Sequence, residues 1–221
     1  NNLANVNTTG FKKDRAVFED LLYQNIVPAG GQVDAESETP TGLMLGTGTR
    51  VVATEKLHAQ GNIITTENAL DLAISGDGYF SVQQADGTIA YSRDGSFKLS
   101  ADGNLVTAGG QAVLPAITVP QNAASLTIGR DGIVTVELAN GGGSSQIGQL
   151  QLSRFVNNSG LQPIGRNLMQ QTNASGDPLV VLPGTDGAGM LMQGALEASN
   201  VNVVEEMVNM IETQRAYEVN S

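Results

Sequence analysis

The sequence predicts an α+β fold, in which helical segments at the two ends of the chain flank a mainly β middle domain of short antiparallel strands. Residues 203–220 contain neither Gly nor Pro and carry apolar residues at helical spacing. Asp-Gly pairs recur between short apolar runs, and they begin at Asp77, Asp86, Asp94, Asp102 and Asp131. The 221-residue chain has 27 Gly and only 4% aromatic residues, which suits many short strands joined by tight turns.

The C-terminal helix is predicted within residues 194–221. Asn202 is a suitable N-cap with Glu205 three residues further on, as in a capping box, and Glu206 adds negative charge in the first turn. At about 100° per residue the apolar side chains span an arc of roughly 200°. They are Val203, Val204, Met207, Val208, Met210, Ile211, Tyr217 and Val219. So wide an arc requires neighbours on more than one side, although docking on the chain's own core is the simpler alternative.

The N-terminal segment, residues 1–25, has two halves. Residues 1–7 are interpreted as the end of a helix that began upstream, with Gly10 suited to a left-handed cap. The apolar residues that follow have mixed spacing, so a short helix and an extended arm both remain open for residues 11–25.

Residues 26–59 have the composition of a linker or insertion arm. Seven Pro or Gly residues punctuate the segment, and taken alone it resembles a disordered stretch. Only residues 51–58 indicate a strand.

The middle domain is predicted over residues 60–193, because Asp-Gly pairs between apolar alternations are a strong hairpin signal. The expected strands are 70–74, 79–83, 89–92, 97–99, 105–107, 112–119, 125–128, 133–138 and 147–155, with a hairpin tip at 141–145. This spacing favours a sandwich or barrel-like domain over a solenoid.

The residues that usually carry chemistry are scarce. The net charge of −11 disfavours a nucleic-acid or anionic-lipid partner. Cys is absent, no apolar run is long enough to span a bilayer, and His58 is the only His and lies in no nucleophile motif. Turn chemistry explains the Asp-Gly carboxylates, although a glycosidase-like pair of carboxylates stays open on sequence alone. We therefore expect no enzyme, no catalytic residue, no metal, no cofactor and no small-molecule substrate.

Several motifs resemble those of the bacterial flagellar rod and hook proteins. Asn-Asn-Leu-Ala-Asn-Val-Asn-Thr-Thr-Gly-Phe at residues 1–11 is similar to their N-terminal motif, and residues 199–202 and 213–218 are similar to their C-terminal motif. Residues 60–62, 70–74, 78–80, 91–97, 160–161 and 165–168 resemble the middle signature. Residues 25–43, after Leu-Leu-Tyr-Gln, stand where distal-rod members carry an insertion. Asn158 and Met169 depart from the usual pattern, but neither touches the terminal motifs.

The resemblance implies a non-enzymatic subunit of the distal rod. The two chain ends would form a helical coiled-coil inner domain that polymerises into a hollow axial tube, with the β domain outside it. The partners would be copies of the chain, proximal-rod proteins, the hook protein and the surrounding P-ring and L-ring proteins. The rod would cross the periplasm and the outer-membrane region, and its subunits would be exported without a cleaved signal peptide.

The residues expected at contacts between subunits follow from this resemblance and from the wide apolar arc. On the inner helices they are Asn2, Leu3, Asn5, Gly10, Phe11, Val204, Met207, Val208, Ile211, Gln214, Arg215 and Tyr217. On the insertion arm they are Val27, Val33 and Leu43. Solvation of the last helical turn is the alternative for Gln214 and Arg215.

Two other functions remain as alternatives. One is a proximal-rod or hook subunit of the same family. The other is a secreted β-rich, carbohydrate-active protein, which would require a concave cleft lined by converging carboxylates.

Overall fold

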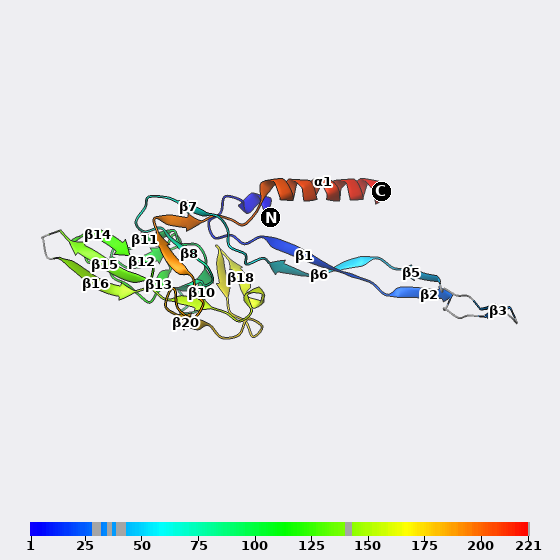
Figure 1. Ribbon diagram of the computed structural model, residues 1–221, viewed down its shortest axis with the longest axis horizontal. Coiled ribbons are helices and arrows are strands. Elements are labelled where there is room, and N and C mark those ends of the chain that lie inside the picture. Colours follow the sequence, from blue (N-terminus) through cyan, green and yellow to red (C-terminus); the bar gives the residue numbers. More distant parts are fainter. Residues whose placement is uncertain (28–31, 35–36, 39–42, 140–142, 221) are drawn as a thin grey trace. The chain divides into compact units, whose positions relative to one another are not determined.

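The computed structural model divides the chain into two compact units (Figure 1). The body unit comprises Asn1–Lys13 and Leu57–Ser221, and the ribbon unit comprises Asp14–Lys56. The structure describes the whole chain except residues 28–31, 35–36, 39–42, 140–142 and 221. The side chains of Asn25, residues 27–43 and Asn220 also lie outside the described part.

The ribbon unit is built from nested antiparallel strand pairs. Strand β1 pairs with β6, β2 with β5, and β3 with β4. Their bounds are β1 Asp14–Asp20, β2 Tyr23–Val27, β3 Gln32–Asp34, β4 Ser37–Glu38, β5 Leu43–Gly46 and β6 Thr49–Lys56. The segment whose composition indicated a linker therefore contains paired strands over much of its described part.

The helical N-terminal segment predicted from the sequence is wrong. The only helical turn there is a 3₁₀ turn, η1, at Leu3–Asn5, and residues 14–20 form strand β1. Of the two readings left open for residues 11–25, the extended arm is correct, because Val17 and Phe18 pair across β1–β6 with Ala53 and Val51. The described residues therefore contain no pair of terminal helices that could form a coiled coil.

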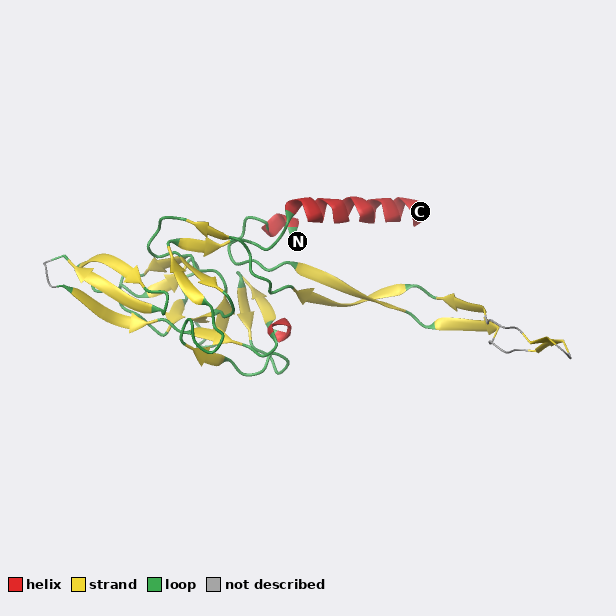
Figure 2. Cartoon of the chain, viewed as in Figure 1, coloured by secondary structure: helices red, strands yellow, loops and turns green. Residues whose placement is uncertain are grey.

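The body unit is mostly β, and every strand pairing in its described part is antiparallel (Figure 2). A seven-stranded sheet has the order β11-β12-β13-β9-β10-β19-β18, and a three-stranded sheet has the order β14-β15-β16. Three further pairs are β17–β20, β21–β8 and β22–β7. The last two bring strands near the C-terminus onto strands near the start of the domain.

The strand bounds of the body unit follow in chain order. They are β7 Ile63–Thr65, β8 Leu72–Ser75, β9 Phe80–Gln83, β10 Ile89–Ser92, β11 Phe97–Leu99, β12 Leu105–Thr107, β13 Ala112–Leu114, β14 Ala123–Ile128, β15 Ile133–Leu138, β16 Ser144–Gln149, β17 Leu152–Arg154, β18 Gln162–Gly165, β19 Leu168–Gln170, β20 Leu179–Val181, β21 Met190–Gln193 and β22 Ala195–Glu197. A second 3₁₀ turn, η2, lies at Asn158–Gly160.

The core of the body unit is apolar and collects side chains from most of these strands. Leu72 and Ile74 of β8, Val82 of β9 and Leu191 of β21 are all fully buried. The rings of Phe80 and Phe97 meet edge to face with centroids 5.0 Å apart, a preferred aromatic geometry. A smaller buried cluster contains Tyr79, Tyr91, Phe155, Leu161 and Met169.

Asp77-Gly78 joins β8 and β9, which lie in different sheets, but the Asp-Gly pairs at Asp86, Asp102 and Asp131 form the predicted hairpins. Gly87, for example, adopts a φ of 83° in the tight β9–β10 hairpin, a conformation that suits Gly. Asp94-Gly95 instead joins strands β10 and β11, which are not neighbours in the sheet. Gly is needed there because a Cβ at position 95 would overlap the carbonyl oxygen of Leu72.

The C-terminal helix is confirmed as α1, Val203–Asn220. The Oδ1 atom of Asn202 accepts hydrogen bonds from the backbone N–H groups of Val204 (3.0 Å) and Glu205 (3.4 Å), as expected of an N-cap. No helix in the described part of the chain is both long and apolar enough to cross a membrane.

Candidate interaction surface

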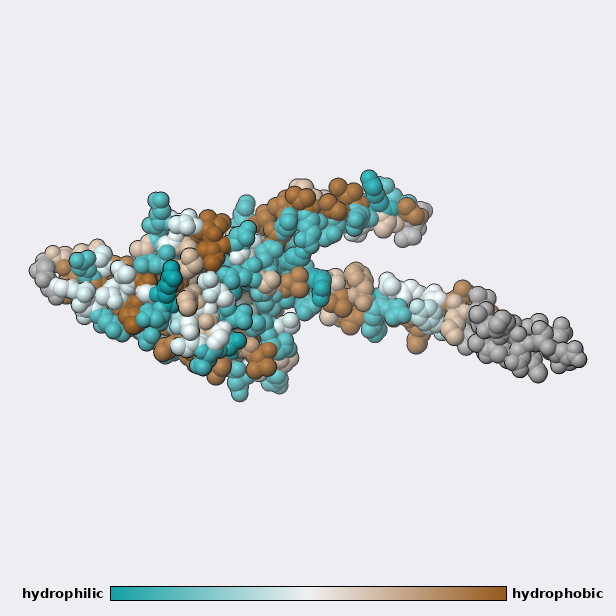
Figure 3. All heavy atoms as spheres, viewed as in Figure 1, coloured by the Kyte–Doolittle hydropathy of each residue, from teal (hydrophilic) through white to brown (hydrophobic). Residues whose placement is uncertain are grey.

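An apolar stripe runs along helix α1 and stays partly exposed to solvent. The side chains of Val204, Met207, Val208 and Ile211 remain 69%, 45%, 47% and 47% exposed. Figure 3 shows brown, apolar atoms along much of the visible side of α1. A contiguous apolar stripe that stays exposed on a folded chain usually marks a contact with another molecule. We refer to these four residues as the α1 stripe.

The other residues predicted on this helix are also exposed. Gln214 and Arg215 are solvent-accessible, and Tyr217 is 74% exposed. At about 100° per residue, Arg215 lies within the angular range of the α1 stripe, whereas Tyr217 projects from another side. Arg215 forms no ion pair within the described part of the chain.

The first turn of α1 is tied to the N-terminal segment. The Nζ atom of Lys13 lies 2.7 Å from Oε1 of Glu205 and 3.3 Å from Oε1 of Glu206. The hydrogen bond that Lys13 donates to Glu205 is the main reason that the pKa of Lys13 is raised. The side-chain amide of Asn2 donates to Oε2 of Glu206 (3.2 Å). These polar contacts join the N-terminal segment to the first turn of α1.

Two of the predicted N-terminal residues stay at the surface of the short 3₁₀ segment. Leu3 is 39% exposed. The amide of Asn5 donates to the carbonyl oxygen of Asn1 (2.9 Å), and its Oδ1 accepts from Thr8 (3.2 Å). The structure therefore gives Asn5 a local, turn-stabilising role within the single chain.

Gly10 and Phe11, also predicted at contacts, are instead buried inside the body unit. The backbone N–H of Gly10 donates to the carbonyl oxygen of Glu197 (2.8 Å), and the N–H of Asn200 donates to the carbonyl oxygen of Phe11 (3.4 Å). Phe11 is only 9% exposed. These bonds attach the N-terminal segment to the segment that leads into α1.

A Gly10→Ala substitution is expected to lower the free energy of unfolding by about 3 kcal/mol or more. Gly10 has a φ of 67°, and a Cβ there would lie 2.6 Å from the backbone N of Asp94 and 2.7 Å from the carbonyl carbon of Arg93. Urea denaturation would measure the loss. Gly87→Ala is the matched control, since Gly87 has a φ of 83° but open space around it, and it should lose only about 1 to 2 kcal/mol. Equal losses in the two variants would show that the close approach at Gly10 contributes nothing.

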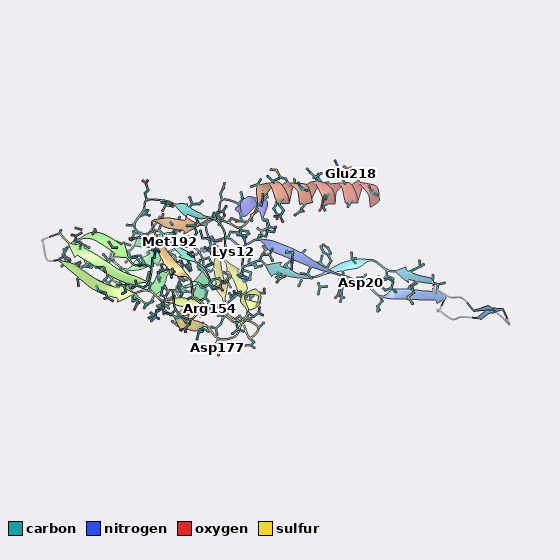
Figure 4. All side chains as sticks on the ribbon, viewed as in Figure 1. Lys12, Asp20, Arg154, Asp177, Met192 and Glu218 are labelled. Carbon is teal, nitrogen blue, oxygen red and sulfur yellow. The ribbon has the colours of Figure 1, made fainter. Side chains whose placement is uncertain are left out.

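A buried charge cluster lies where the two chain ends meet the β domain. The Nζ atom of Lys12, which Figure 4 labels, lies 2.5 Å from Oε1 of Glu197, and Nε of Arg93 lies 3.3 Å from Oε2 of the same carboxylate. The side chain of Lys12 is 2% exposed, that of Arg93 is 4% exposed and that of Glu197 is 0% exposed. Burial lowers the pKa of Lys12, as does the charge of Arg93, whereas Glu197 acts in the opposite direction.

Backbone groups contribute further hydrogen bonds to these buried charges. Lys12 also donates to the carbonyl oxygen of Ala59 (2.7 Å), and the N–H of Gly61 donates to Oε1 of Glu197 (2.9 Å). The guanidinium of Arg93 donates to the carbonyl oxygens of Gly78 (2.9 Å) and Gly76 (2.8 Å). A buried charge is tolerated when it is paired and hydrogen-bonded in this way.

Asn200 links the same region to the base of α1. Its Oδ1 accepts from the backbone N–H of Lys13 (2.7 Å), and its amide donates to the carbonyl oxygens of Leu57 (2.8 Å) and Ala59 (3.0 Å). We call Lys12, Arg93, Glu197 and Asn200 the anchor.

Sequence reasoning did not identify the anchor as a unit. Arg93 and Asn200 stood within quoted motifs, but nothing in those motifs indicated that they act together with Lys12 and Glu197. Only the fold brings the four positions together.

Two surface hollows are lined by residues that include no Asp or Glu. A hollow of about 550 Å³ is lined by the backbone and polar side chains of residues such as Lys13, Gln60 and Asn202, and another of about 220 Å³ by residues such as Val6, Ile64 and Leu196. No carboxylate lines either hollow, which is not what a carbohydrate-cleaving site requires. Among the described residues, no three His, Cys, Asp or Glu side chains are grouped to hold a metal ion.

His58 has a partner that explains its position. The hydroxyl of Tyr79 lies 2.8 Å from Nδ1 of His58, and the Tyr79 ring packs edge to face on Phe155 with centroids 6.0 Å apart. Burial is the main reason that the pKa of Tyr79 is raised. The pair therefore belongs to the border of the aromatic cluster.

Comparison with known proteins gives two family matches and full-length relatives. Residues 73–136 match the model described as flagellar hook protein FlgE/F/G D1 domain, and residues 192–221 match that of the flagellar basal body rod FlgEFG protein C-terminal. The flagellar basal-body rod protein FlgG of Buchnera aphidicola subsp. Schizaphis graminum is 54% identical over 221 residues, covering 100% of this chain and 85% of the relative. The FlgG of Caulobacter vibrioides is 45% identical, covering 100% of this chain and 85% of the relative. The FlgF of the same organism is 36% identical, covering 99% and 81%.

Proposed function

Because the chain belongs to the family of flagellar basal-body rod proteins, with higher identity to FlgG than to FlgF relatives, we propose that its structural role in the distal rod rests on self-assembly through helix α1. The observation that carries this proposal is the α1 stripe, which the single chain leaves exposed. Burying such a stripe against neighbouring copies contributes roughly 25 cal/mol per Å² of apolar surface, before the entropy of ordering is subtracted.

The anchor supports the same proposal by making the base of the helix rigid. A subunit that transmits torque requires a rigid connection between its helix and its β domain. The buried contacts of Lys12, Glu197 and Asn200 join the N-terminal segment, the segment before α1 and the β domain in a single network. Association with other rod and hook components follows from the family, and contacts with the P-ring and L-ring proteins are part of the proposal.

The location in the rod is tested by labelling. A short epitope tag inserted in the exposed β9–β10 turn at Gly87, where a Cβ would meet no atom within 4 Å, should leave the fold intact. Antibody labelling of purified basal bodies should then decorate the rod segment next to the hook. Normal motility combined with label found elsewhere would contradict the proposed role.

The ribbon unit is proposed to stiffen the rod through contacts with neighbouring copies. The side chains of Val27, Val33 and Leu43, predicted at these contacts, lie outside the described residues, although the backbones of Val27 and Leu43 pair across β2–β5. Other apolar side chains of the ribbon are exposed, including Leu22 (88%) and Met44 (56%). Both side chains are thus available for contacts with neighbouring copies.

Shortening the ribbon should make the rod more flexible or change its length. Replacing residues 25–44 by Asn-Gly would join Gln24 directly to its cross-strand partner Leu45 through a two-residue turn. Electron microscopy of isolated hook–basal bodies would measure rod curvature and length. A second variant, in which residues 26–43 become a Gly-Ser segment of equal length, separates lost contacts from lost length. Unchanged stiffness in both variants would show that the segment is only a tether.

A further inference from the structure

The β1–β6 ribbon has two chemically different faces. Successive residues of a strand point to opposite faces, and residues paired across strands share a face. On one face, Arg15 pairs with Glu55 at 2.9 Å, and Glu19 forms an ion pair with Arg50, with Val17 and Ala53 between them. We call this the ion-paired face.

The opposite face of the same ribbon is apolar over its central part. Ala16 stands opposite Thr54, and Phe18 stands opposite Val51. Phe18 is 64% exposed and Val51 is 57% exposed. Asp14 and Lys56 form an ion pair at one end of this face (2.7 Å), and Asp20 lies at the other end, where Figure 4 labels it. We call this the apolar face.

The chemical difference between the two faces indicates which face binds a partner. Charges that are already paired with each other can stay in water on the ion-paired face. An isolated two-stranded ribbon is only marginally stable in water, and a large aromatic side chain exposed on one face adds to the need for a partner. The apolar face is therefore the docking side of the ribbon.

The charge at the end of the apolar face identifies a matching surface. Within the described part of the chain, Asp20 forms no ion pair, and neither does Arg215 on α1. A second apolar row that stays exposed in the described part of the chain is the α1 stripe, which ends at Ile211, four residues before Arg215. Phe18 and Asp20 are separated by about 7 Å along the strand, and Ile211 and Arg215 by about 6 Å along the helix. One apolar contact and one ion pair can thus form together.

We propose that the apolar face of the β1–β6 ribbon docks on the α1 stripe of a second copy of the chain, with Phe18 against Ile211 and Asp20 paired with Arg215. The proposal rests on the proposed function, and it adds a defined partner and register to it. The ribbon of one subunit would then brace the helix of its neighbour, which gives α1 the additional cover that its wide apolar arc requires.

Disulfide trapping tests this contact with little background, because the chain contains no Cys. Phe18→Cys and Ile211→Cys would be produced in separate copies and expressed together in cells that lack the native gene. Oxidation of isolated rods should yield a dimer that joins the two variants. Phe18→Cys paired with Asn209→Cys, which lies on the opposite side of the helix, is the control and should yield at least tenfold less dimer.

The outcomes separate this inference from the proposed function. Rods that assemble without the specific dimer would overturn the contact and leave the rod role standing. A disulfide that forms only when both Cys residues are on one chain would also overturn it, because the helix would then be covered by its own ribbon. Failure of the unmodified chain to form rods would instead count against the proposed function.

A charge exchange provides a second test that does not depend on Cys. Asp20→Arg and Arg215→Asp should each reduce swimming speed several-fold, because each places like charges opposite one another. The double variant should recover most of the loss, since the ion pair is restored with its direction reversed. A double variant no better than the worse single variant would contradict the pairing.

Discussion

Ile211→Asp is expected to abolish rod assembly and swimming while leaving the folded subunit intact. Ile211 is the last residue of the α1 stripe and is 47% exposed in the single chain. Full burial of such a side chain contributes about 1.5 to 3 kcal/mol, and a carboxylate buried in its place adds a desolvation penalty. A combined loss of about 4 kcal/mol per contact weakens association roughly 1,000-fold. Because each subunit of a polymer repeats the same contact, the defect should prevent growth.

The measurement has two parts and a matched control. Basal bodies counted by electron microscopy report assembly, and urea denaturation of the purified subunit reports stability, which should change by no more than about 0.5 kcal/mol. Asn209→Asp introduces the same charge two residues earlier, on the side of α1 away from the stripe. This control should assemble normally. Normal rods in the Ile211→Asp strain would show that the α1 stripe is not an assembly surface.

Glu197→Ala is expected to give the largest loss of folding stability, about 3 to 5 kcal/mol, which is typical when one partner of a buried ion pair is removed. The substitution would leave Lys12 and Arg93 as two buried cations without their shared carboxylate. It would also remove an acceptor from the N–H of Gly61. Glu205→Gln, which affects a partly exposed ion pair with Lys13, should lose less than about 1 kcal/mol.

The pH dependence of this loss identifies its cause. In the native chain the pKa of Lys12 is lowered because burial outweighs the opposing effect of Glu197. Without Glu197, burial and the charge of Arg93 remain, and both lower the pKa of Lys12 further. The unfolded chain then binds the Lys12 proton more tightly than the folded chain, so folding stability rises with pH as the folded protein releases this proton. The deficit of Glu197→Ala relative to the native chain should therefore shrink between pH 7 and pH 9.5, and a pH-independent deficit would contradict the buried-charge explanation.

Local signals in the sequence located the central strands well. The predicted ranges 89–92, 97–99, 105–107 and 133–138 coincide with β10, β11, β12 and β15. Each of these runs is bounded by turn residues, which mark where a strand ends. The 147–155 run was predicted as one strand, but it is divided between β16 and β17.

Strands that pair over long distances in the chain were missed. Strands β21 and β22 pair with β8 and β7, far back in the sequence, so no hairpin turn joins either pair. The prediction of a helical N-terminal segment is wrong for a related reason. Its mixed apolar spacing fits a helix or a strand, and only pairing with β6 decides for the strand.

By itself, the sequence determined the family, the C-terminal helix with its cap, most strands of the β domain and the residues of the α1 stripe. These depend on local patterns: motifs, turn residues and helical periodicity. The tertiary structure alone decided that the N-terminal segment is extended, that Gly10 and Phe11 are buried, and that Lys12, Arg93 and Glu197 meet. The physical reason is that a buried charge is stable only beside its partner, and which partner lies beside it depends on how distant strands pair. The sequence and the structure agree on helix α1. Its apolar arc is too wide for a lone helix and is exposed in the single chain, so it requires a neighbour.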